Sequence, residues 1–188
     1  MTDIPFALLP CGDLEQSSEP SFDVEITGRL TVHPTTINVQ YHVTGDINDI
    51  QIPLADQQGE RRNELWLATC FELFVSAADN QQYWEYNLSP AHHWAVFHFT
   101  NYRETKTDEA SINKLSIVTQ QSNDHHYELS CSLPLPAAVQ NKKIEISVCA
   151  IIQDIRGRFH YYALIHCDQK ADFHNRKSFI IGVDPGNS

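Results

Sequence analysis

Carboxylate and amide side chains occur among aromatic residues between positions 65 and 103. Glu72, Glu85, Asn87 and Arg103 lie in segments that are otherwise rich in apolar and aromatic residues. A carboxylate in such a segment needs a hydrogen-bonding or charged partner if the fold buries it. Three interpretations are open: a structural ion pair with Arg103, a solvent-facing side of a sheet, or a surface that binds a polar ligand.

Three tryptophans, Trp66, Trp84 and Trp94, fall in the same part of the chain. Flat indole rings beside carboxylates and amides suit sugars, whose C–H groups stack on the ring while their hydroxyls form hydrogen bonds. A sandwich core filled with aromatic side chains would also produce this pattern. We expect Trp84 to lie in the core, and we keep Trp66 and Trp94 as ligand-binding candidates because each adjoins a polar turn.

Histidines give a third group of candidates. His166, Asp172 and His174 lie close together in the sequence, and Asp172 and His174 would share a face of an extended segment. Imidazole and carboxylate groups bind metals and polar ligands, so haem or metal binding through His166 and His174 is an alternative function. No recognised zinc-ligand spacing is present. The adjacent pairs His92-His93 and His125-His126 are expected in solvated turns.

Sequence motifs of common enzymes are missing. The chain contains no nucleophile elbow, phosphate-binding loop, dinucleotide fingerprint or HExxH sequence, so we assign no catalytic residue. An enzyme that uses Glu72 and Glu85 as a glycosidase pair would need the two carboxyl groups about 5 to 10 Å apart across an open cleft. Burial of both side chains would argue against that function.

The elements that must position these residues are strands. Short runs rich in β-branched and aromatic residues, separated by turn residues, extend from position 22 to position 184. This spacing predicts an all-β antiparallel sandwich, of jelly-roll or immunoglobulin-like type, formed as a single domain over residues 1–188. Residues 71–76 and 83–88 predict a hairpin whose alternation places Glu72 and Glu85 on one sheet face.

Charge and composition limit the partners. The formal net charge is −11 and the isoelectric point is near 5.2. A field of this sign repels phosphate backbones and anionic lipids, so we expect neither nucleic acid nor membrane as a partner. Asp3, Pro5 and Pro10 interrupt the N-terminal apolar run, which is therefore not a secretory signal, and a cytoplasmic location is expected.

The cysteines are widely spaced along the chain. Five cysteines are scattered without a CxxC pair, which argues against a disulfide framework or a structural zinc site. Cys70, Cys131 and Cys149 lie in apolar or alternating runs, where a small buried thiol is expected.

Three segments carry a family resemblance. They are LWLATCFELFV (65–75), YWEYNLSPAHHWAVFHFTNYR (83–103) and YYALIHCDQKADFHNRKSFIIGV (161–183). The chain resembles the DOMON-like domains related to family 9 carbohydrate-binding modules, and in particular a bacterial stand-alone branch. The last segment is similar to that branch's WALxH…DFH…F ending, with Tyr162 where Trp is common.

The resemblance implies a β-sandwich that binds sugar or haem at a sheet face or rim. Trp66 and Trp94 would correspond to tryptophans that clamp a sugar. The branch's own motif residues would form the polar floor of a pocket, and in this chain they are Glu72, Glu85, Asn87, His166, Asp172 and His174. Haem relatives use a Met and a His, but Met1 is the sole methionine here, so haem would need histidines alone. We therefore predict a non-enzymatic module that binds a small ligand, a carbohydrate or sugar derivative. The alternative is a structural or interaction module in which the matching residues only hold the sandwich together.

Overall fold

The computed structural model describes residues 1–12, 22–56 and 58–184, and these residues form twelve strands and three short 3-10 helices. The first sheet has the strand order β1-β2-β3-β9-β8 and consists of β1 (Thr2–Pro10), β2 (Val24–Val32), β3 (Thr36–Gly45), β9 (His126–Pro134) and β8 (Ile117–Asn123). The second sheet has the order β7-β6-β5-β4-β10-β11 and consists of β7 (Thr107–Asp108), β6 (Trp94–Phe99), β5 (Tyr83–Leu88), β4 (Cys70–Ala77), β10 (Ile144–Gln153) and β11 (Phe159–Ala163), with β12 (Ile181–Val183) paired to β10. The helices are η1 (Ile47–Asp49), η2 (Leu65–Leu67) and η3 (Arg176–Ser178).

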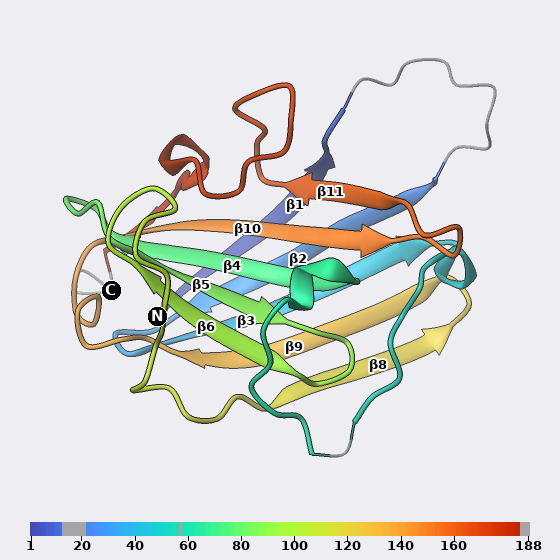
Figure 1. The fold of residues 1–188 in the computed structure, drawn as a ribbon, viewed down its shortest axis with the longest axis horizontal. Coiled ribbons are helices and arrows are strands. Elements are labelled where there is room, and N and C mark those ends of the chain that lie inside the picture. Colours follow the sequence, from blue (N-terminus) through green and yellow to red (C-terminus); the bar gives the residue numbers. More distant parts are fainter. Residues whose placement is uncertain (13–21, 57, 185–188) are drawn as a thin grey trace.

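All strand pairs that these residues form are antiparallel, which confirms the predicted all-β antiparallel sandwich. In Figure 1 the strands β4, β5 and β10 lie in front of the fainter β1 and β2. No helix of the described residues is long and apolar enough to cross a membrane.

Strand β1 joins the two sheets, and the sequence did not predict it because Pro5 and Pro10 interrupt its apolar pattern. It pairs with β2 from Thr2 to Leu8 and then with β11 at Leu9 and Pro10. Proline lacks an N–H donor and is tolerated where one edge of a strand has no ladder partner. The short pairing with β11 leaves most of β1 in that situation.

The main core fills the space between the sheets. Alternate residues of each strand enter it, as the period of two requires. From the second sheet come Phe71, Leu73 and Val75 of β4, and from the first sheet come residues such as Val39 and Leu129. Tyr41 of β3 also lies in this core, and its hydroxyl donates a hydrogen bond of 2.8 Å to the backbone carbonyl of Glu72 on the opposite sheet.

Strands β4 and β5 are buried on both faces, because a second apolar cluster covers the outer face of the second sheet. Phe74 and Tyr83 belong to this cluster, together with Phe97 and Phe99 of β6. Cys149 is also part of it, and the predicted burial of Cys70, Cys131 and Cys149 is confirmed. The outer face of this sheet is therefore a second interior, roofed by loops.

One of these loops spans residues 164–180. Strand β11 pairs with β10 at its C-terminal end, and β12 returns to the same edge of β10 at its N-terminal end. The residues between them pass over the outer face of the second sheet, and Phe173 and Phe179 pack into the cluster there. Figure 1 shows this orange-red segment between β11 and the C-terminal end.

Candidate ligand-binding site

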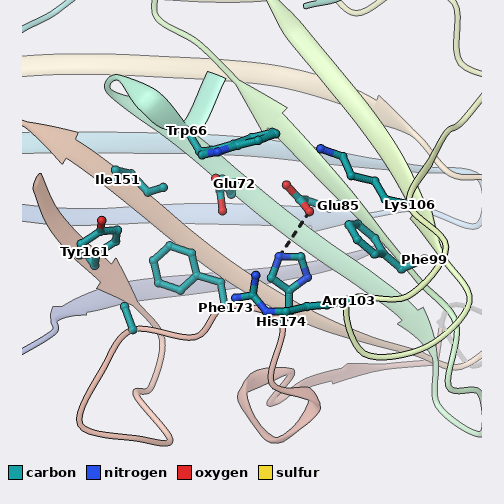
Figure 2. Close-up of a pocket in the computed structure, with 11 residues that line it drawn as sticks. Trp66, Glu72, Glu85, Phe99, Arg103, Lys106, Ile151, Tyr161, Phe173 and His174 are labelled. Carbon is teal, nitrogen blue, oxygen red and sulfur yellow. Dashed lines mark ion pairs between the residues drawn. The ribbon is translucent and has the colours of Figure 1, made fainter. Parts of the chain in front are cut away.

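A pocket with a volume of about 390 Å³ lies on the outer face of the second sheet, beneath the loops. This volume is in the range of small-molecule sites. Figure 2 shows the side chains that line it: Trp66, Glu72, Glu85, Phe99, Arg103, Lys106, Ile151, Tyr161, Ala171, Phe173 and His174.

The floor of the pocket comes from the β4–β5 hairpin. Glu72 lies opposite Asn87 in the register, and Phe74 lies opposite Glu85. Because side chains alternate, Glu72, Glu85 and Asn87 all face away from the main core. The predicted hairpin and the shared face of the two glutamates are confirmed.

The walls come from loops. Trp66 is carried by η2, which precedes β4, and it forms one edge of the pocket. The Nζ atom of Lys106 lies 4.1 Å from the Trp66 ring centroid and 3.7 Å from that of Phe97. Such cation–π contacts hold the lysine against the aromatic rim.

Arg103 is fixed from two sides. Its backbone is left-handed, with a φ of 54°, and its N–H donates a hydrogen bond of 3.0 Å to the Tyr83 hydroxyl. Its guanidinium donates to Asp172 at 2.8 Å. Asp172 also accepts a hydrogen bond from the Tyr102 hydroxyl. The partner of Arg103 is therefore Asp172 of the 164–180 loop, and not the set of Glu72, Glu85 and Asn87 as one interpretation of the sequence had it.

A hydrogen-bonded chain links this loop to the pocket floor. The Tyr83 hydroxyl, which accepts from the backbone N–H of Arg103, lies 2.8 Å from Nδ1 of His174. Its own proton is then donated to Nδ1, so we assign the imidazole proton to Nε2. Nε2 lies 3.7 Å from Oε2 of Glu85, and Oε1 of Glu85 accepts a hydrogen bond of 2.6 Å from Asn87.

His174 is neutral at pH 7. Burial lowers its pKa from 6.5 to about 4, and the positive charge of Arg103 acts in the same direction. The contact with Glu85, drawn as a dashed line in Figure 2, is therefore made by an N–H dipole and not by an imidazolium. A neutral imidazole that points its N–H toward the pocket can donate a hydrogen bond to a ligand.

Glu72 is a buried polar residue of the pocket floor. Its side chain is 3% exposed, and it lines the pocket. Within the described parts of the chain, no hydrogen bond or ion pair reaches its carboxyl group. Burying a polar group without a partner is costly, and this carboxyl group faces the pocket, where it can accept a hydrogen bond.

The two glutamates hold protons more firmly than free carboxyl groups do. Burial raises the pKa of Glu72 well above its usual value, and the nearby Glu85 raises it further. Burial also raises the pKa of Glu85, while the hydrogen bond from Asn87 acts against this. A carboxyl group accepts hydrogen bonds in either protonation state and donates one when it is protonated. Both side chains are buried, which is the condition that argues against a glycosidase pair.

Seven of the ten predicted site residues lie in or beside the pocket. Five of them line it, namely Trp66, Glu72, Glu85, Arg103 and His174. Asn87 and Asp172 contact lining residues directly, through Glu85 and Arg103.

Three predicted residues lie elsewhere. Trp94 is 3% exposed in the main core, with the Arg61 guanidinium 4.4 Å from its ring centroid. Tyr162 also faces the main core. His166 does not line the pocket, and its Nε2 contacts the backbone carbonyl of Leu9 at 2.8 Å. The structure therefore gives His166 and His174 different partners and does not bring them together as ligands of one haem or metal ion.

The sequence interpretation missed several lining residues. Tyr161 lies beside Ile151 in the β10–β11 register and faces the pocket, whereas the neighbouring Tyr162 faces the core. Phe173 stands directly between the predicted Asp172 and His174. Lys106 follows a turn of irregular backbone, and no sequence signal places it on Trp66.

His93 and His126 do not lie in solvated turns, although the sequence predicted such turns for both histidine pairs. His93 is 7% exposed, and its Nδ1 lies 3.3 Å from the backbone N–H of Glu60. His126 is the first residue of β9. His92 and His125, their neighbours, do lie in turns.

Comparison with solved structures shows the fold. A proposed carbohydrate-binding protein from Bacteroides uniformis superposes with a TM-score of 0.69 at 12% sequence identity, covering 93% of this chain and 83% of that one. A family 9 carbohydrate-binding module from Caldicellulosiruptor kristjanssonii, solved with cellotriose, gives a TM-score of 0.50 at 11% identity, covering 85% and 71%. No protein-family model matches the chain, and no curated protein matches it either.

Proposed function

We propose that the protein is a non-enzymatic module that binds a carbohydrate or sugar derivative in the pocket beneath the loops. The observation that carries this proposal is the Glu72 carboxyl group, which is buried, faces the pocket and has no hydrogen-bonding partner among the described residues. A sugar hydroxyl would supply that partner.

The surrounding side chains match the two kinds of surface that a sugar presents. Trp66 and Phe173 offer aromatic surface for C–H groups. Glu85 and the N–H of His174 offer acceptor and donor positions for hydroxyls, and Arg103 offers further donors. The same fold binds cellotriose in the C. kristjanssonii module, which makes a saccharide the first ligand class to test.

The affinity should be modest. A few hydrogen bonds and one or two ring contacts must offset the lost freedom of the ligand, which places the dissociation constant at about micromolar to millimolar. Calorimetric titration with a panel of mono- and oligosaccharides, including glucose and cellotriose, tests the proposal. A folded protein that shows no heat with any member of the panel would count against it.

Two matched pairs of variants locate the site. Glu72→Ala should weaken binding about tenfold or more, because the side chain then offers the ligand no hydrogen-bonding group, and a hydrogen bond to a buried carboxyl group contributes about 1.5 kcal/mol or more. Its control is Glu25→Ala on the exposed face of β2. Trp66→Ala should also weaken binding, and its control is Leu67→Ala, the exposed neighbour in η2. Equal affinities in all four variants would place the sugar elsewhere.

A further inference from the structure

A second cluster of polar side chains lies on the first sheet, on the opposite side of the sandwich from the pocket. His42 is on β3, and His126 and Glu128 are on β9. The register places His42 opposite Glu128 and Thr44 opposite His126, so the three side chains are near neighbours. Strands β3 and β9 can be followed in Figure 1 behind β5 and β6.

Alternation shows which way the cluster faces. Tyr41 and Val43, the neighbours of His42 in β3, are buried in the main core. Tyr127 and Leu129, which flank Glu128 in β9, are buried there as well. Because successive side chains of a strand point to opposite faces, the cluster lies on the outer face of the first sheet. Its three side chains are each about one-third exposed, at 30%, 33% and 30% for His42, His126 and Glu128, so ions in solution can reach them.

The distances in the cluster are those of a metal site. Nδ1 of His42 lies 3.2 Å from Oε1 of Glu128, and Nε2 of His126 lies 3.0 Å from the same oxygen. One ligand atom from each residue lies within 4.8 Å of the other two. In a tetrahedral zinc site with bonds of about 2.0 to 2.1 Å, ligand atoms are about 3.3 Å apart. Small rotations of the side chains would suffice to surround an ion.

We propose that His42, His126 and Glu128 form a three-ligand site for a divalent transition-metal ion such as Zn²⁺, with water in the fourth position. Two imidazoles and one carboxylate are a recurrent zinc ligand set. The same donors suit Cu²⁺ and Ni²⁺, and Cu²⁺ binds a given nitrogen–oxygen site more tightly than Zn²⁺.

Metal binding would require both histidines to change tautomer. In the present arrangement a ring N–H of each histidine faces Oε1 of Glu128. On metal binding, each ring would carry its proton on the other nitrogen and offer the lone pair of the facing nitrogen to the ion. The site is separate from the pocket, so metal binding and sugar binding should be independent.

Zinc titration of the full-length protein tests the site. The protein is first treated with a chelator and dialysed, then titrated with ZnCl₂ by calorimetry, with bound zinc counted after equilibrium dialysis. We expect one zinc ion per chain in the tightest class of sites and a higher midpoint of thermal unfolding with zinc present. A chain that takes up no zinc would overturn the proposal.

Single substitutions assign the ligands. His42→Gln and His126→Gln should each weaken zinc binding more than tenfold, and Glu128→Gln should weaken it while leaving both imidazoles in place. The matched control is His125→Gln, which removes the adjacent imidazole in the turn and should leave zinc binding unchanged. Circular dichroism checks that each variant is folded. Unchanged zinc affinity in both His42→Gln and His126→Gln, or a loss confined to His125→Gln, would refute the assignment.

Discussion

Replacing His174 with glutamine should remove a large part of the pH dependence of stability. The side chain is 14% exposed, and burial lowers its pKa from 6.5 to about 4. Between these two values the unfolded chain binds a proton at this position and the folded protein does not. The contribution of His174 to the free energy of unfolding therefore falls as the pH is lowered through this window.

The size of the effect follows from the two pKa values. They differ by about 2.5, since 6.5 minus about 4 is about 2.5. Each unit of difference in pKa corresponds to about 1.36 kcal/mol. His174 therefore contributes about 3 kcal/mol to the free energy of unfolding at pH 7, and this contribution is lost below pH 4. Above pH 6.5 the imidazole is neutral in both states and adds no pH dependence.

The contribution of His174 is obtained as the difference between the free energies of unfolding of the wild type and His174→Gln. The raised pKa values of Glu72 and Glu85 act in the opposite direction, because the folded protein holds their protons more tightly than the unfolded chain does. Urea unfolding followed by tryptophan fluorescence, at intervals from pH 7.5 to pH 4, gives the free energy of unfolding of wild type and His174→Gln. The wild-type value minus the variant value should decrease by about 3 kcal/mol over this range.

Tyr83→Phe is the matched control. It removes the hydroxyl that lies 2.8 Å from Nδ1 of His174 but keeps the buried imidazole. Its stability should be lower than that of the wild type, yet most of the pH dependence should persist because burial is the largest cause of the low pKa. If the curves of wild type and His174→Gln run parallel from pH 7.5 to pH 4, the assignment of a buried neutral histidine is refuted.

Three further substitutions test buried polar groups of the fold. Glu72→Gln should raise the free energy of unfolding at pH 7.5, because it removes a buried carboxyl group of raised pKa. This gain in stability should shrink as the pH falls toward 4.5, and a gain that is independent of pH would contradict the explanation. Tyr41→Phe should lower the free energy of unfolding by about 1 kcal/mol through loss of the hydrogen bond between the sheets, as measured by urea unfolding. Asp154→Ala should lower the free energy of unfolding by about 3 kcal/mol, because the buried carboxylate accepts hydrogen bonds from the backbone N–H groups of Arg156 and Arg158. A loss of stability near zero would disprove this role.

The floor of the pocket was predictable from the sequence because the period of two is strict. Phe71, Leu73 and Val75 form one apolar face of β4, so Glu72 had to lie on the other, and the short connection to β5 implied a hairpin. The register then brought Glu85 to the same face. Local information was sufficient for this part of the site.

The walls of the pocket depend on pairings between distant segments. Trp94 faces the core because it lies opposite Leu88 in the β5–β6 register, and a one-residue shift would have turned it toward the pocket. In the same way, the β10–β11 register turns Tyr161 toward the pocket and Tyr162 toward the main core. Lys106 and Phe173 reach the site through loops whose course depends on tertiary contacts. The sequence did not predict β1 because its two prolines interrupt the apolar pattern of a strand. Its position depends on pairing with both β2 and β11, which no local pattern shows.

Strand β12 returns to the same edge of β10 that β11 occupies. Residues 164–180 are anchored at both ends to one strand, so their length and sequence can vary without altering any ladder pair of the sheet. This segment carries Phe173 and His174 into the pocket. Exchanging this one surface loop would therefore change the lining of the pocket while the two sheets beneath it stay the same.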